Sequence, residues 1–198
     1  MKTQFAKSVK ACSAILSLSL ILFLSACTGG QEKSNEEAGK KDEAVVKAPT
    51  MDIHTATVLG DLDVIKQHIA AGTDLDLREP TMGSSPLISA AVFGKTEIAR
   101  ALIEGGADVN LQNNEGSSAL HTAAFLCRLE IVEMLLENGV DKSLLNNYGA
   151  TAQQSLMAPF QDVKFVYDQF SKDLGPLGFK LDYAYVEATR PVIAELLK

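Results

Sequence analysis

Two adjacent stretches of equal length decide the fold: SSPLISAAVFGKTEIARALIEGGADVNLQNNEG, residues 84–116, and SSALHTAAFLCRLEIVEMLLENGVDKSLLNNYG, residues 117–149. Both begin with two serines, carry a pair of alanines in the first third and end on a glycine. A weaker copy occupies residues 51–83 and has one extra residue near Pro80. A recurrence of about 33 residues is typical of a solenoid, in which each unit buries its apolar face only against its neighbours.

Each unit predicts two helices joined by a tight turn. Ile98, Leu102 and Ile103 recur at i, i+4 and i+5, which places them on one face of the second helix. Pro86 fits the first turn of the first helix, where its missing N–H is not needed. One glycine follows each second helix, where a left-handed C-cap suits glycine: Gly72, Gly106 and Gly139.

This pattern resembles the ankyrin repeat, whose units read T-P-L-H-x-A-A, then a glycine, I-V, L-L and G-A-D-x-N. Ser85-Pro86-Leu87 and Ala90-Ala91 match its first helix, and Gly106-Ala107-Asp108-Val109-Asn110 matches its return loop. The resemblance covers residues 51–149 and implies an all-α helical solenoid of three repeats, 51–83, 84–116 and 117–149. A doubly wound α/β fold is the competing interpretation, but the sequence has no strand-like runs between the predicted helices.

Two residues of the third unit carry particular expectations. Cys127 replaces the glycine between its two helices, which predicts a tighter or repacked turn there. His121 matches the histidine of the ankyrin pattern, and the resemblance implies a structural role in which its ring bonds backbone between repeats. Ser84-Ser85 and Ser117-Ser118 belong to the repeat register, so we interpret them as turn and cap residues and not as nucleophiles.

Beyond the repeats, residues 150–198 predict a degenerate unit and a helical cap, because a solenoid needs its last apolar face covered. A helix opens at Ala158-Pro159 and Gly175-Pro176 stops it. A final short helix is expected over 192–197, with Thr189 as its N-cap and Pro191 in its first turn. The aromatic residues of this region favour either a packed cap or an interaction lobe.

The first 26 residues have the features of an export signal: three lysines, an apolar run from Ala11 to Leu24, and then Leu24-Ser25-Ala26-Cys27. This ending resembles the bacterial lipoprotein signal, which implies cleavage before Cys27 and acyl chains, palmitate among them, on that residue. A transmembrane anchor and an ordinary cleaved signal are the alternatives, and the run is short for a membrane span. By the rule of Gram-negative lipoproteins, Thr28 implies the outer membrane facing the periplasm. In a cell with one membrane, the exterior of that membrane is expected.

The remaining N-terminal residues, 27–50, predict a lipidated flexible tether. Residues 28–50 contain five acidic and four basic residues and few apolar ones, so they cannot bury enough surface to offset the entropy of ordering.

Composition limits the possible partners. The 198 residues carry a net charge of −7, and residues 51–149 alone hold 14 acidic and 6 basic residues. This balance disfavours nucleic acid and favours a partner protein with a basic patch. No G-x-S-x-G, Walker, H-E-x-x-H or C-x-x-C pattern occurs, so we expect no catalytic or metal-binding residue, no cofactor and no small-molecule substrate.

The resemblance places partner contacts on the finger loops and on the groove lined by the first helices. Two residues after each alanine pair are expected to face that groove, and their apolar nature predicts a contact patch unless the cap or tether covers it. The predicted contacts are Val58, Leu59, Val92, Phe93, Phe125 and Leu126 in the groove, with Arg78, Glu79, Asn113, Glu115 and Tyr148 in the fingers. The expected function is a membrane-tethered protein-binding module, with an inhibitor or immunity-type role as the narrower hypothesis; a structural envelope protein and an unrecognised enzyme are the alternatives.

Overall fold

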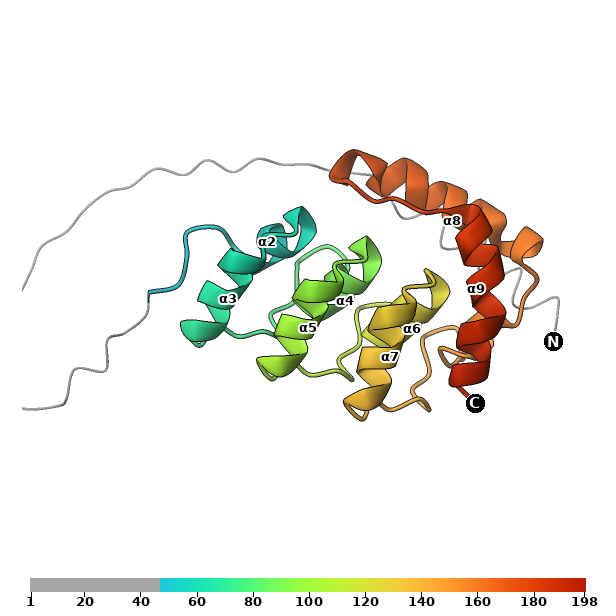
Figure 1. Ribbon diagram of the computed structural model, residues 1–198, viewed down its shortest axis with the longest axis horizontal. Helices are drawn as coiled ribbons and strands as arrows, with labels where there is room; N and C mark the ends of the chain where they lie inside the picture. The colour runs from blue at the N-terminus through green and yellow to red at the C-terminus, as the bar shows by residue number, and fades with distance from the viewer. Residues whose placement is uncertain (1–46) are drawn as a thin grey trace, which may run out of the picture.

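The computed structural model describes residues 47–198, and these form a row of helix pairs closed by two longer helices (Figure 1). The signal segment 1–26, Cys27 and most of the tether lie outside the described residues. The first pair is α2 (Ile53–Leu59) and α3 (Leu62–Ala70), the second α4 (Pro86–Phe93) and α5 (Thr96–Glu104), and the third α6 (Ala119–Phe125) and α7 (Leu129–Glu137). The described region is therefore an all-helical solenoid, with an isolated bridge between Gln112 and Ser118 in place of strands.

Local chemistry starts the helices where the repeat predicts. Asp52 caps α2 by accepting a bond from the Thr55 N–H at 2.9 Å. Ser85 caps α4 in the same way, with Pro86 in the first turn. The expectation that the repeat serines are cap residues is confirmed for Ser85 and for Ser118, the cap of α6.

Small side chains let the helix pairs stack. Ala90, Ala91, Ala123 and Ala124 are completely buried, as close helix approach requires. Large aliphatic residues from both helices of each pair fill the remaining space, and each pair supplies half of the core layer that its neighbour completes. The glycines that follow α3, α5 and α7 have positive φ angles of 67°, 95° and 73°, so the predicted left-handed caps at Gly72, Gly106 and Gly139 are confirmed.

The end of the chain differs from the prediction in one element. Helix α8 (Phe160–Leu174) begins after Pro159 and ends at Gly175, as expected. The expected short helix over 192–197 is wrong, because α9 runs from Tyr183 to Leu196 with Asp182 as its N-cap and Pro191 inside it. Val186, Thr189, Arg190, Ile193 and Leu197 form its buried face, and burial of that face offsets the backbone bond that Pro191 cannot make.

The two long helices do different work. Helix α9 packs on α6 and α7, together with a short 3-10 helix at Gln154–Leu156, and so closes the open end of the solenoid. Helix α8 extends back along one edge of the repeats, and residues 175–182 return from its far end to α9 (Figure 1).

Candidate protein-binding surface

One residue in each finger loop holds that loop in shape. The Glu79 carboxylate accepts bonds from the N–H groups of Thr81, Met82 and Ser84 at 2.6–3.0 Å. Partial burial alone would raise the pKa of this carboxyl, but these donors outweigh it and hold the pKa below its usual range. The Glu79 carboxylate is therefore engaged by backbone groups of its own loop, and a contact with a partner would compete with these hydrogen bonds.

Asparagines take over this role in the other two fingers. Asn113 Oδ1 accepts from the N–H groups of Glu115 and Ser117 at 3.0 and 2.9 Å. One repeat later, Asn146 Oδ1 accepts from the N–H groups of Tyr148 and Ala150. The column of Glu79, Asn113 and Asn146 is thus structural. The sequence predicts Glu79 and Asn113 as partner contacts because the repeat register does not show which finger residues turn inward.

The fingers also bond to one another. The Asn114 N–H donates to the Met82 carbonyl and the Asn147 N–H donates to the Glu115 carbonyl, both at 2.9 Å. These bonds link successive repeats and give a continuous edge of loops. On this edge Arg78 and Tyr148 are exposed, as a contact surface requires, and Leu77 and Leu145 are exposed apolar side chains beside them.

The groove residues fall into an open part and a covered part. Leu59 is 64% exposed and Val58 is partly exposed, so the first repeat leaves its apolar pair open. Leu126, by contrast, is 1% exposed and belongs to the core. Its expected position in the groove is therefore wrong, and Leu126 instead ends α6 with a buried side chain.

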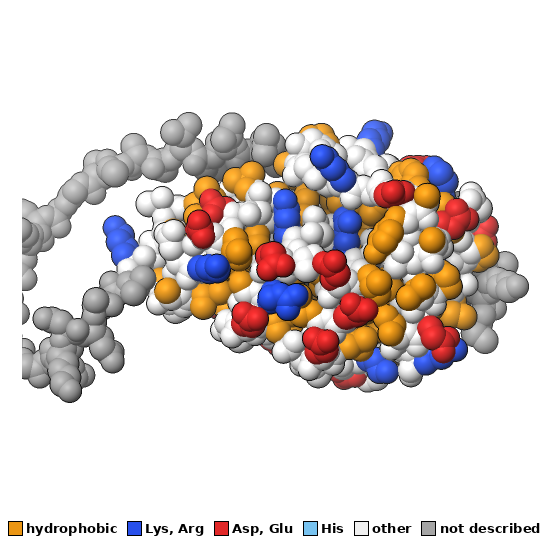
Figure 2. Space-filling view, in the orientation of Figure 1, with side chains coloured by type: hydrophobic (Ala, Val, Ile, Leu, Met, Phe, Trp, Pro, Cys, Tyr) orange, Lys and Arg blue, Asp and Glu red, His pale blue; other side chains and the backbone are white. Residues whose placement is uncertain are grey.

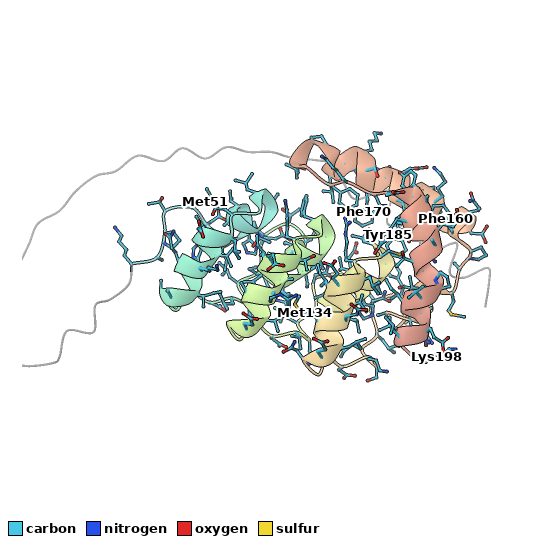
Figure 3. The ribbon with its side chains drawn as sticks, in the orientation of Figure 1. Met51, Met134, Phe160, Phe170, Tyr185 and Lys198 are labelled. Atoms are coloured by element: carbon cyan, nitrogen blue, oxygen red, sulfur yellow. The ribbon has the colours of Figure 1, made fainter. Side chains whose placement is uncertain are left out.

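Aromatic residues of the C-terminal region cover the middle of the groove. The Phe93 ring meets Phe179 edge-on at a centroid distance of 6.4 Å. The Phe125 ring stacks on Tyr167 of α8 at 4.7 Å and lies 6.4 Å from Phe170. Figure 3 shows Phe170 on the side of α8 that faces the repeats. Val92, Phe93 and Phe125 thus do not form the open patch across three repeats that the sequence suggested.

The turn at Cys127 keeps the positive φ angle of the glycine turns. Its φ angle is 55°, against 84° and 63° at Gly60 and Gly94, which occupy the same place in the earlier repeats. The expectation of a tighter or repacked turn is confirmed in the hydrogen bonding, because the Cys127 N–H bonds to the Ala124 carbonyl three residues back, whereas the Gly94 N–H bonds to the Ala90 carbonyl four residues back. A side chain at a positive φ angle is also strained. The buried thiol lies 3.5 Å from the Val186 carbonyl of α9, and burial raises the pKa of Cys127 to about 11. The side chain fills the joint between repeat and cap as an inert thiol.

Two arginines that are not among the predicted site residues complete this joint. Arg128 donates from Nη2 to the carbonyls of Val92 and Lys180, each at 3.2 Å. Arg190 is 4% exposed and donates to the Tyr167 hydroxyl at 2.6 Å and to the carbonyls of Leu156 and Ala158 at 3.0 and 2.8 Å. The sequence could have indicated Arg190, because it lies among the apolar residues on the buried face of α9. The predicted helix over 192–197 begins after Arg190 and so hides this pattern.

His121 plays the structural part that the resemblance implied. Its Nδ1 lies 2.9 Å from the Ser118 hydroxyl, and its Nε2 lies 3.1 Å from the Ala150 carbonyl in the next unit. Burial lowers the pKa of His121, and the carbonyls of Ala150 and Leu144 oppose that effect. The imidazole is therefore held neutral as a bridge between repeats.

Within residues 47–198, no group of three His, Cys, Asp or Glu side chains is placed to hold a metal ion. In the same region no helix combines the length and apolar character that crossing a bilayer demands.

The charged side chains on the face in Figure 2 are of both signs and lie among apolar groups. The three ion pairs found among the described residues are all at the surface and join residues three or four positions apart: Arg100 with Glu97, Lys164 with Asp168, and Lys198 with Glu195. They contribute little to stability, and Glu97 is the one acidic residue of the repeats that takes part in them.

Comparison with known proteins agrees with this architecture. Residues 53–146 match the family model for ankyrin repeats in three copies. The chain is 34% identical over 83 residues, 41% of its length, to the human DNA-binding protein RFXANK, and it spans about a third (32%) of that relative. It is also similar to the crystal structure of the ankyrin repeat domain of Bcl-3, a member of the IkappaB family. The TM-score is 0.51 at 29% identity, covering 58% of this chain and 50% of that one.

The folded region is thus an ankyrin-repeat solenoid with a helical cap, a class of protein–protein interaction module. Ankyrin repeats bind other proteins, and the fold alone does not select one partner.

Proposed function

We propose that this protein is a lipid-anchored binding module of the bacterial envelope, which holds a partner protein against its finger loops and the open first repeat. The observation that carries the proposal is the group of large apolar side chains exposed on these parts of the repeats: Leu59, Leu77, Leu145 and Tyr148. Exposed apolar groups gathered on a charged surface are typical of protein contact sites.

Charge gives the expected partner its sign. The repeats hold 14 acidic and 6 basic residues, and the ion pair found within them, between Arg100 and Glu97, is at the surface. A partner with a basic face would be steered toward the repeats, so association should slow as the ionic strength rises. We further propose an inhibitor or immunity-type role, in which the captured partner is an enzyme whose active site the module obstructs.

A matched pair of surface variants tests the contact site. Leu59 and Leu177 are both more than half exposed, but Leu59 lies in the open groove and Leu177 lies beyond α8. After cross-linking in envelope extracts, Leu59→Asp should lose the wild-type partner, while Leu177→Asp should retain it. Retention by both variants would contradict the assignment of the groove. If the captured protein is an enzyme, adding the purified chain should lower its turnover, and unchanged turnover would remove the inhibitor role.

The anchor has its own test, because Cys27 and Cys12 both lie in the N-terminal segment. Labelling with radioactive palmitate and membrane fractionation should show loss of label and release of the protein for Cys27→Ser. The control variant Cys12→Ser should keep both. Membrane retention of Cys27→Ser would contradict lipid anchoring through this residue.

A further inference from the structure

The middle of the groove is occupied by an extended piece of the chain's own C-terminal region. Residues 179–182 have no helical or strand structure and lie between α8 and α9. Phe179 is 4% exposed and packs between Phe93 of the second repeat and Phe170 of α8, at centroid distances of 6.4 and 6.0 Å. The Phe179 side chain thus fills the groove between the second repeat and α8.

Arg128 holds this piece at its backbone. The guanidinium donates to the Lys180 carbonyl and lies 5.6 Å from the centre of the Phe179 ring. Its Nε is buried and has no hydrogen-bond partner, and none of the ion pairs in residues 47–198 involves Arg128. Burial also lowers the pKa of Arg128, because the removal of water disfavours the charged form of the guanidinium. A carboxylate at this point would satisfy the cation better than the present acceptors do.

We propose, on the basis of the proposed function, that residues 179–182 are an internal ligand of the groove on the second and third repeats. A partner segment that carries an aromatic residue followed by an acidic one would displace them. The aromatic ring takes the place of Phe179, and the carboxylate pairs with Arg128. The groove is then a second contact site, separate from the fingers, and its accessibility is set by the chain itself.

The surroundings of the segment suit displacement. Helix α9 packs on α6 and α7 of the third repeat, and Arg190 fixes it to Tyr167, Leu156 and Ala158 within the C-terminal region. The segment before it turns at Gly175-Pro176 and at Gly178, whose φ angle is 90°. The Lys180 side chain is exposed. The segment therefore gives Arg128 a backbone carbonyl as acceptor and no carboxylate. With an internal ligand of this kind, the apparent Kd of a competitor equals its intrinsic Kd divided by the fraction of molecules in which the site is free.

A peptide supplied in trans tests the proposal without knowledge of the natural partner. The probe is a fluorescent peptide with the sequence of residues 174–183, LGPLGFKLDY, and its binding is followed by anisotropy. The purified full chain with Phe179→Ala should bind it, and the wild-type chain should bind it at least ten times more weakly because its own segment competes. A peptide in which Lys180→Asp supplies the carboxylate should bind about tenfold more tightly. A peptide carrying Phe179→Ala should not bind.

Arg128→Gln provides a second variant in case Phe179→Ala disturbs the fold, which circular dichroism would reveal. In the Arg128→Gln chain the acidic peptide should lose its advantage over the native peptide. Failure of the native peptide to bind the Phe179→Ala chain, or equal binding to wild type and variant, would overturn the proposal. Both results are independent of capture by the fingers, so failure of the proposed function would be recognised separately.

Discussion

Replacing Arg190 with methionine tests whether the cap is held by the buried arginine. The side chain has three hydrogen bonds, to the Tyr167 hydroxyl and to the carbonyls of Leu156 and Ala158, and none of the ion pairs among residues 47–198 involves it. Methionine keeps most of the volume but leaves two carbonyls without donors, at about 1–3 kcal/mol for each buried one. Removing the buried charge also removes its desolvation penalty, which offsets part of this loss. We therefore expect Arg190→Met to lower the free energy of unfolding by about 2–4 kcal/mol.

The assay is urea denaturation followed by far-UV circular dichroism, with Tyr167→Phe and the double variant measured alongside. Tyr167→Phe removes the hydroxyl that accepts from Arg190 and donates to the Phe125 carbonyl at 2.7 Å, at about 1–2 kcal/mol. Because the two residues share one bond, the double variant should lose about 1 kcal/mol less than the sum of the single losses. An Arg190→Met loss below about 1 kcal/mol, or strict additivity, would refute the idea that these bonds hold the cap.

Three further predictions concern the repeats. Cys127→Gly should be at least as stable as Cys127→Ala in denaturant titrations, since glycine relieves about 1–2 kcal/mol of left-handed strain; a glycine variant clearly less stable than the alanine variant would contradict the strain. The folded-state pKa of His121 lies below its ordinary value of 6.5, so its contribution is complete above pH 6.5 and is lost as pH falls from there toward the folded pKa. His121→Gln should flatten stability against pH in that window, and an unchanged slope would exclude His121 as the cause. Glu79→Ala should cost about 1–3 kcal/mol by freeing three backbone N–H groups and should raise hydrogen exchange at Thr81, Met82 and Ser84; unaltered exchange there would show that the carboxylate does not hold the first finger.

The repeat region could be predicted because its information is local and periodic. A recurrence of about 33 residues specifies which side chains face the next repeat, and the structure confirms the helix pairs, the buried alanines and the three left-handed glycine caps. The fingers were harder, because the inward turn of Glu79 and Asn113 depends on side-chain bonds to backbone groups two to five residues away. Exposure and hydrogen bonding at such positions follow from loop geometry, which hydrophobic periodicity does not encode.

The error at α9 has a definite physical cause. Pro191 after Thr189 has the local pattern of a helix start, and a proline inside a helix costs about 3 kcal/mol. Here the helix continues through it, because Val186, Ile193 and Leu197 bury one face against the third repeat. Burying three such side chains stabilises the longer helix by more than the proline costs, at roughly 1.5–3 kcal/mol for each. Tertiary packing thus decided an element that local propensity described wrongly.

The same longer helix explains why the groove is divided. A helix that starts at Tyr183 must be reached from the far end of α8 at Leu174, and the chain between them crosses the second and third repeats. Had α9 begun near Val192, that connection would have been nine residues longer and need not have placed Phe179 against Phe93. Coverage of the groove is therefore a consequence of the helix start that Asp182 sets by accepting the N–H groups of Ala184 and Tyr185. Substitutions that weaken this cap should loosen the internal ligand before they disturb the repeats.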